Sequence, residues 1–169
     1  PYPVRLAGFG VRRPKLPVRG ADVAGRVEAV GPGVEGFAPG DEVFGVGAGS
    51  FAEYVVCPAG KLARKPERLS FVQAAAMPVS GLTALQAVRD HGRVTAGQRV
   101  LVVGASGGVG SYAVQIAKAF GAHVVGVASA GKASLVAELG ADRVIDYATE
   151  DFADGRERYD VILDTGGHT

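Results

Sequence analysis

The clearest hydrophobic pattern in the chain is an apolar, β-branched run that leads into a glycine cluster and then a helical repeat. The run VLVV at residues 100–103 is typical of a strand buried in a parallel sheet. Between Tyr112 and Phe120, apolar residues recur at the spacing of one helix face. A strand, a glycine turn and a helix in this order are the context in which a glycine fingerprint indicates dinucleotide binding.

The glycines of this cluster are spaced G-x-x-G-G-x-G, from Gly104 to Gly110. Taken alone, such a cluster is more often a turn or a helix cap. With a strand before it and a helix behind it, the bare backbone can approach a pyrophosphate, and the helix N-terminus offers free N–H groups. The residues that we expect to bind the pyrophosphate are Gly104, Ser106, Gly107, Gly108, Val109 and Gly110.

After residue 98, strand and helix patterns alternate. Further strands are predicted at residues 123–128, 144–145 and 159–164, and a further helix at residues 132–139. Such alternation gives a parallel sheet with helices on both faces, that is, an α/β fold. A complete doubly wound nucleotide-binding sheet has roughly six strands, so this pattern is typical of part of such a domain.

The first half of the chain consists of short strand patterns separated by glycine and proline turns. Strands are predicted within residues 21–30, 42–46, 51–56 and 61–65. This spacing is typical of a compact antiparallel barrel or sandwich. The basic segment at residues 12–15 is expected to be a solvated loop.

Two helices are predicted where the two patterns meet. Ser70 is expected to cap a helix over residues 71–77, which Pro78 interrupts. A second helix is expected over residues 81–90, with Gly92 ending it. We place the boundary between two domains in this region.

The composition is that of an ordinary globular protein, with 47% hydrophobic and 21% charged residues. A net charge of +1 provides no electrostatic footprint for nucleic acid or an anionic membrane. No apolar run approaches the roughly 20 residues that span a bilayer, and the first residues lack the pattern of a signal peptide. The single cysteine, Cys57, excludes an internal disulfide. We therefore expect a cytoplasmic protein without nucleic-acid or membrane partners.

Six segments, in order along the chain, resemble the medium-chain dehydrogenase/reductase superfamily, and specifically its zinc-free quinone oxidoreductase-like branch. They are residues 20–31, 40–45, 50–55, 81–84, 104–110, and 140–142 together with 145–147. The resemblance implies a partial GroES-like β-barrel over residues 1–78, followed over residues 79–169 by the N-terminal part of a doubly wound, parallel-sheet (Rossmann) NADP-binding domain. It also implies NADPH as cofactor, a quinone, enone or aldehyde-type carbonyl as the small-molecule substrate, and a homodimer for the full-length protein.

The chain departs from the zinc alcohol dehydrogenases at the position where the family pattern has a zinc-ligating histidine. That triplet is glycine-histidine-glutamate in those enzymes and Gly20-Ala21-Asp22 here. The lone cysteine also rules out their four-cysteine structural lobe. The three histidines, His91, His123 and His168, are each interpreted as surface or packing residues rather than ligands. We therefore expect that the protein binds no metal and works without zinc.

The choice of cofactor can be argued from the residues themselves. NAD-binding folds usually place a carboxylate about 20 residues after the glycine turn, to bind the ribose 2′-hydroxyl. Here Ser129 and Lys132 follow the second strand, and no carboxylate occurs before Glu138. A hydroxyl and an ammonium would accept a 2′-phosphate that a carboxylate would repel, so the sequence favours NADPH.

The resemblance adds Tyr147 and Thr83 to the expected cofactor site and supports Lys132. It assigns Lys132 and Tyr147 to the 2′-phosphate, and Thr83 to the nicotinamide side of the cofactor. The alternatives remain a solvated lysine for Lys132, strand-end packing for Tyr147 and an ordinary helix position for Thr83. The segment at residues 164–167 follows a strand, where open α/β sheets bind ligands, but no direct contact is expected there.

No catalytic acid or base is assigned, because hydride transfer needs mainly orientation and desolvation of the reactants. Ser106 lies in the glycine turn and does not have the context of a nucleophile elbow. Two hypotheses follow: an NADPH-dependent, zinc-independent oxidoreductase, or a non-catalytic NADPH-binding protein with a structural or sensor role. In either case, the 169-residue chain by itself is expected to be inactive.

Overall fold

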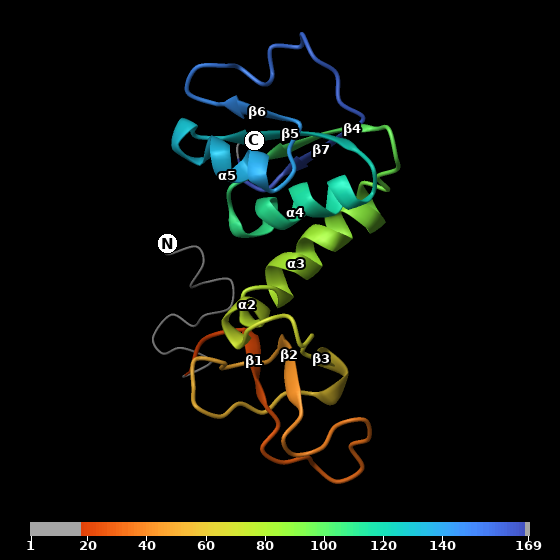
Figure 1. Ribbon diagram of the computed structural model, residues 1–169, viewed down its shortest axis with the longest axis vertical. Helices are drawn as coiled ribbons and strands as arrows, with labels where there is room; N and C mark the ends of the chain where they lie inside the picture. The colour runs from red at the N-terminus through yellow and green to blue at the C-terminus, as the bar shows by residue number, and fades with distance from the viewer. Residues whose placement is uncertain (1–17, 168–169) are drawn as a thin grey trace, which may run out of the picture. The chain divides into compact units, whose positions relative to one another are not determined.

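The computed structural model describes residues 18–167, and the chain divides into two compact units, Pro1–Val79 and Ser80–Thr169. Figure 1 colours the first unit from red to yellow and the second from green to blue. The basic segment at residues 12–15 and His168 lie outside the described residues. Within the described part of the chain, no helix combines the length and the apolar character needed to cross a bilayer.

The first unit contains a three-stranded antiparallel sheet in the order β1-β2-β3. Its elements are β1 (Asp22–Arg26), β2 (Glu42–Val46), the short helix η2 (Ala59–Lys61) and β3 (Leu62–Arg64). The strand predicted at residues 42–46 is confirmed. The first strand ends at Arg26, earlier than predicted, although the Val27 N–H still donates to the Asp41 carbonyl at 2.9 Å in the same register.

The strand predicted at residues 51–56 is wrong. This segment is irregular, and the side chains of Phe51, Tyr54 and Val56 are exposed. An alternating apolar pattern becomes a strand only when another strand pairs with it. The described sheet contains only β1, β2 and β3, so this segment has no strand beside it within residues 18–167.

A charged cluster connects the sheet of this unit with helix α2 (Phe71–Ala75). Glu42 pairs with Arg26 at 2.6 Å and with Lys65 at 2.9 Å. The Lys65 side chain is only 5% exposed, and its Nζ also donates to the Leu69 carbonyl at 2.7 Å. Both cations lie over the Phe71 ring, at 5.7 Å and 5.2 Å from its centroid. The buried lysine is thus paired and hydrogen-bonded, as burial of a charge requires.

The helical region that follows begins as predicted but is divided differently. Ser70 caps α2 in a capping box with Gln73, which confirms the predicted cap. Helix α3 (Pro78–Leu85) begins at the proline itself and continues as the π-helical segment η3 (Gln86–His91). Proline suits the first helical position, where its missing N–H would have had no partner anyway. The Val79 N–H donates to Asp22 Oδ1 at 2.7 Å.

The second unit contains a four-stranded parallel sheet in the order β6-β5-β4-β7. Its elements are β4 (Arg99–Val103), α4 (Gly108–Ala119), β5 (His123–Ala128), η4 (Ala130–Lys132), α5 (Ala133–Glu138), β6 (Arg143–Asp146) and β7 (Val161–Asp164). The predicted parallel α/β arrangement is confirmed. The order places the first strand of the unit, β4, in the interior of the sheet, directly before the glycine turn.

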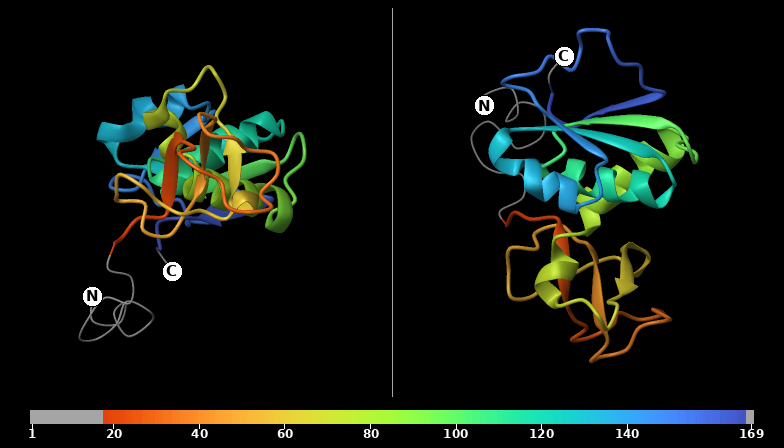
Figure 2. Two further views of the ribbon diagram at one scale, coloured as in Figure 1. Left: turned by 90° about the horizontal axis from the view of Figure 1, so that it is seen from below. Right: turned by 45° about the horizontal axis from the view of Figure 1, so that its top comes forward.

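One face of this sheet packs against helices. Alternate residues of β4 and β5, such as Val100, Val102 and Val124, are fully buried there with the apolar side of α4 and with Val136 of α5. Figures 1 and 2 show both helices beneath this face. Gly126 leaves space for α5, because a Cβ there would lie 2.6 Å from Val136 Cγ1.

The opposite face of the sheet is covered differently, and the prediction of helices on both faces is corrected here. Leu101, Val125 and Ile145 are buried on this face, and Phe152 and Tyr159 of the β6–β7 crossover pack against them. Within residues 18–167 this crossover contains no helix. It runs through turns in which aspartate side chains accept backbone N–H groups, such as Ala153 N–H to Asp151 Oδ1 at 2.9 Å, and these bonds compete with helix formation.

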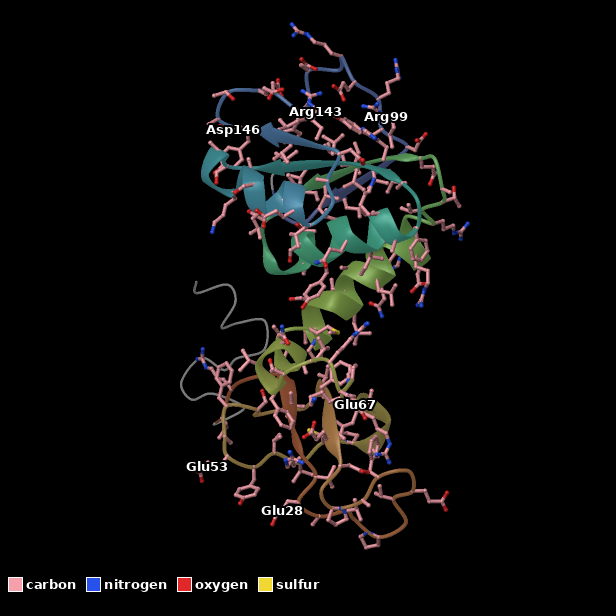
Figure 3. All side chains as sticks on the ribbon, viewed as in Figure 1. Glu28, Glu53, Glu67, Arg99, Arg143 and Asp146 are labelled. Carbon is pink, nitrogen blue, oxygen red and sulfur yellow. The ribbon has the colours of Figure 1, made fainter. Side chains whose placement is uncertain are left out.

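Ion pairs hold the crossover at the amino ends of the strands. Arg143 of β6 pairs with Glu150 at 2.6 Å and also with Glu157, while Arg99 of β4 pairs with Glu157 at 2.7 Å. Figure 3 shows both arginines on the side of the sheet where the crossover runs. The Tyr159 hydroxyl donates to Glu157 at 3.2 Å. The hydrogen bond from Arg143 to Glu150 and the neighbouring Glu157 charge raise the pKa of Arg143.

Asp142 connects helix α4 with strand β5 through charge. Lys118 Nζ lies 2.8 Å and 2.9 Å from its two carboxylate oxygens, and the Val124 N–H donates to it at 2.7 Å. Partial burial acts to raise the pKa of Asp142, but these hydrogen bonds and the charges of Lys118 and His123 outweigh it. The pKa is therefore lowered from its ordinary value of 3.8.

The Asp142→Asn variant is expected to be less stable by about 1–2 kcal/mol, because charge-assisted bonds are lost at a partly exposed site. A lowered folded-state pKa gives stability that is present above the unfolded pKa and is lost as the pH falls through the folded pKa. Urea unfolding between neutral pH and about pH 2 should therefore show a weaker acid dependence for the variant than for the wild type. Glu138→Gln, at the exposed end of α5, is the control, and equal behaviour of both variants would contradict the assignment.

Candidate functional site

The glycine turn between β4 and α4 is built by backbone packed against backbone. Gly104 has φ +77°, a left-handed backbone conformation that residues other than glycine adopt only with strain. The Gly107 N–H donates to the Gly104 carbonyl at 2.9 Å and closes the turn. A Cβ on Gly110 would overlap that same carbonyl oxygen and lie 2.9 Å from Ala105 Cα. The helix therefore begins as close to the end of the strand as a peptide chain allows.

The N-terminus of α4 forms the second part of the site. Gly107 is the N-cap residue, and α4 runs for 12 residues from Gly108. The N–H groups of its first turn have no partner within the helix, and the helix dipole places a partial positive charge beside them. The first turn contains no acidic residue. This arrangement favours an anion in front of Gly108, Val109 and Gly110.

The end of β7 supports the same turn. The Thr165 hydroxyl donates to the Val103 carbonyl at 2.8 Å, and the Thr165 N–H donates to the same carbonyl at 3.0 Å. A Cβ on Gly104 would come within 3.0 Å of the Gly166 nitrogen. The segment after β7 therefore fixes the glycine turn from one side, a supporting role for which the sequence pattern carried no specific signal.

A cavity of about 310 Å³ opens at the carboxyl ends of β4 and β5. It is lined by Val103, Gly104, Ser106, Val127, Ala128, Ser129, Tyr147 and Phe152. Four residues expected at the site from sequence therefore share one cavity, although they come from three separate turns: Gly104, Ser106, Ser129 and Tyr147. The carboxyl ends of parallel strands are where open α/β sheets bind ligands.

The other expected residues do not line this cavity. Gly107 and the first turn of α4 are on the anion-binding helix end. Lys132 is exposed at the end of η4, three residues after Ser129. Thr83 is exposed on α3, one turn after Ser80, whose Oγ would lie 3.2 Å from a Cβ on Gly108. The structure thus brings α3 up to the helix end without placing Thr83 in the cavity.

Phe152 lines the cavity and was not expected from the sequence. It lies in the β6–β7 crossover, far along the chain from the glycine turn, and it packs on the sheet face below the cavity. The only signal in the sequence was an isolated aromatic residue in a polar stretch. Its place was decided by the path of the crossover.

The charges around the cavity are consistent with a phosphate near Ser129. No carboxylate follows β5 before Glu138, at the end of α5. Asp146 ends the neighbouring strand, and its Oδ1 accepts the Ala148 N–H at 3.1 Å, which holds the turn that contains Tyr147. Ser129 is itself the N-cap of η4.

A larger cavity, of about 420 Å³, lies behind the crossover. It is lined by ten residues, including Arg143, Glu150, Phe152, Glu157 and Tyr159. Arg143 pairs there with Glu150 and Glu157, as described for the crossover network, and Arg156 pairs with Asp154 at 3.2 Å. None of the residues expected from sequence lines it.

The next question is whether the described residues could bind a metal ion. Among residues 18–167, no three His, Cys, Asp or Glu side chains come together as a metal site. Burial raises the pKa of the Cys57 thiol, which disfavours the thiolate that metal ligation requires.

Comparison with known proteins identifies relatives of both units. Residues 4–67 match the family model described as an alcohol dehydrogenase GroES-like domain, and residues 108–169 match the one described as a zinc-binding dehydrogenase. A curated relative is the 2-methylene-furan-3-one reductase of Solanum lycopersicum. It is 42% identical over 96% of this chain and 45% of its own length.

Two solved structures are similar to the chain. The quinone oxidoreductase of Coxiella burnetii has a TM-score of 0.75 and 39% identity, over 79% of this chain and 44% of its own. The mycobacterial protein Rv1454c, solved in complex with NADPH, has a TM-score of 0.71 and 36% identity, over 78% of this chain and 42% of its own. The chain therefore spans a little under half the length of these relatives.

The Gly110→Ala variant is expected to shift the glycine turn, because the added Cβ meets backbone atoms that cannot rotate away. Overpacking of this kind costs about 1–3 kcal/mol, and displacement of the anion-binding N–H groups should weaken dinucleotide binding at least about ten-fold. Gly60→Ala is the matched control, since nothing lies within 4 Å of its added Cβ and it belongs to the first unit. Thermal unfolding and calorimetric titration provide the measurements, and unchanged stability and binding in Gly110→Ala would refute the tight contact.

Proposed function

Because the chain belongs to the medium-chain dehydrogenase/reductase superfamily, in its quinone oxidoreductase-like group, we propose that the whole protein is an NADPH-dependent oxidoreductase that works without zinc. Its proposed acceptors are quinones, enones and aldehyde-type carbonyl compounds. The observation that carries the proposal is the single cavity that unites the glycine turn with Ser129 and Tyr147.

Each part of the site has a distinct task in this proposal. The glycine turn and the α4 N-terminus bind the pyrophosphate through backbone N–H groups. Ser129, Lys132 and Tyr147 bind the 2′-phosphate, and Thr83 on α3 contacts the nicotinamide side. When bound, the nicotinamide supplies a hydride to the acceptor. The chain itself orients the cofactor and excludes water, and no side chain is assigned to proton transfer.

The proposed acceptors are supported by the chemistry of the relatives. The tomato relative is named for reduction of a 2-methylene-furan-3-one, and the Coxiella burnetii protein is a quinone oxidoreductase. Both substrates are conjugated carbonyl compounds, in which a carbon atom can accept a hydride while the carbonyl oxygen takes up negative charge. The same acceptor class is therefore proposed for this protein.

The direct test is oxidation of NADPH by the full-length protein with a panel of quinones, enones and aldehydes. Turnover with at least one of these classes is the expected result. NADPH binding without turnover across the panel would instead support the non-catalytic, structural or sensor role.

The cofactor preference is tested at Lys132 and Ser129. Lys132→Ala should weaken NADPH about ten- to a hundred-fold and leave NADH nearly unchanged, since one charge-assisted contact is worth about 1.5–3 kcal/mol. Ser129→Asp should lower the preference further, because a carboxylate repels the 2′-phosphate and accepts a hydrogen bond from the NADH ribose.

The measurement is kcat/KM for both cofactors in the full-length protein. Lys118→Ala, which removes a lysine of α4 that pairs with Asp142, serves as a control for general destabilisation. Equal losses for NADPH and NADH in Lys132→Ala would show that the residue supports the fold, and a wild-type preference for NADH would refute the assignment.

Zinc independence is tested by metal analysis and by chelation of the full-length protein. The proposal rests on Ala21, which replaces a ligating histidine, and on the single cysteine. Prolonged dialysis against a strong chelator should leave kcat and KM unchanged. A stoichiometric zinc ion whose removal abolishes turnover would overturn this part of the proposal.

A further inference from the structure

Phe152 lines both of the cavities described above, the one at the cofactor site and the charged one behind the crossover. It is partly buried and packs against the sheet face formed by Leu101, Val103 and Val127. Two of these, Val103 and Val127, also line the cofactor-site cavity. Phe152 therefore forms a wall between the two spaces and continues the apolar surface of the sheet to the edge of the cofactor site.

The segment that carries Phe152 is fastened at both ends. On one side, the Ala148, Thr149 and Glu150 N–H groups all donate to Asp146, at 3.1, 3.0 and 2.9 Å. Glu150 is also paired with Arg143. On the other side, the Ala153 N–H donates to the side chain of Asp151 at 2.9 Å. The phenylalanine is therefore held against the sheet by its neighbours on both sides and not by a helix.

The covalent structure of NADPH determines which part of the cofactor would lie in this part of the cavity. The 2′-phosphate is on the ribose that carries the adenine, so the adenine must lie within one sugar of the groups that bind the phosphate. Beside Ser129 and Tyr147, the cavity offers the apolar side chains of Val103, Val127 and Phe152. A flat, weakly hydrated base is suited to such a surface, and an aromatic side chain adds to its attraction.

We propose that Phe152, supplied by the helix-free β6–β7 crossover, is the aromatic wall against which the adenine of the cofactor packs. The inference rests on the proposed function, since it presumes a dinucleotide at this site. It makes Phe152 a determinant of affinity for the base, separate from the residues that read the 2′-phosphate. Phe152 contacts neither phosphate nor nicotinamide in this assignment.

The proposal predicts that substitutions of Phe152 change KM for NADPH and for NADH equally. Phe152→Leu keeps apolar cover over the sheet but removes the ring, and it should raise KM for NADPH and for NADH by the same factor, about three- to ten-fold. Phe152→Ala should raise both about ten-fold or more. Phe152→Tyr keeps the ring and should retain most of the affinity for both cofactors.

Tyr159→Leu is the matched control. Tyr159 lies in the same crossover and packs on the same sheet face, but it lines only the cavity behind the crossover. Its loss should lower stability with little effect on either KM. A second readout uses fragments of the cofactor with the full-length protein: 2′,5′-ADP, which contains the adenine, and reduced nicotinamide mononucleotide, which does not. Phe152→Leu should weaken only the first in calorimetry.

The outcomes separate this inference from the proposed function. If Lys132→Ala weakens 2′,5′-ADP while Phe152→Leu and Phe152→Ala leave it unchanged, the site binds NADPH but the aromatic wall is refuted. Equal effects of Phe152→Leu and Tyr159→Leu on KM would also refute it, because a general loss of packing would then explain both. If wild-type protein binds neither 2′,5′-ADP nor NADPH, the proposed function itself fails.

Discussion

The second unit depends on one close approach of backbone to backbone, between the end of strand β4 and the start of helix α4. Gly110 lies against the Gly104 carbonyl so closely that no side chain fits between them. This contact sets where α4 begins, and therefore where its free N–H groups and its dipole point. Thr165, which follows the neighbouring strand β7, donates to the last carbonyl of β4 and supports the same turn. The cavity at the carboxyl ends of the strands follows from this geometry.

The sheet of this unit has two differently covered faces, and both affect the site. Helices α4 and α5 bury one face with small and branched side chains, a dense arrangement typical of a parallel sheet. The other face is covered by two aromatic side chains from an irregular crossover, which is held by an arginine–glutamate network at the amino ends of β4 and β6. Such exposed pairs individually contribute little, but the two pairs that share Glu157, together with the pair of Arg143 and Glu150, fix a loop that no helix stabilises.

The first unit has a different balance of forces. Its sheet is small, and helix α2 is attached to it through Glu42, Lys65, Arg26 and the ring of Phe71. The nearly complete burial of Lys65 is offset by a carboxylate, by main-chain carbonyls and by the aromatic ring. Several apolar side chains of residues 51–56 remain exposed, because a segment with a strand-like pattern forms a strand only when another strand pairs with it.

The sequence by itself determined the local features. Strands β2 and β5, the Ser70 cap and the glycine turn were all predictable, because periodicity, capping and left-handed backbone depend on neighbouring residues. The missing carboxylate after β5 was equally readable. Only the tertiary structure placed Ser129, Tyr147 and Phe152 around one cavity, and only it showed that residues 51–56 form no strand and that the crossover has no helix. These outcomes depend on which segments meet in space, and hydrophobic periodicity within one segment carries no information about the partner that will cover it.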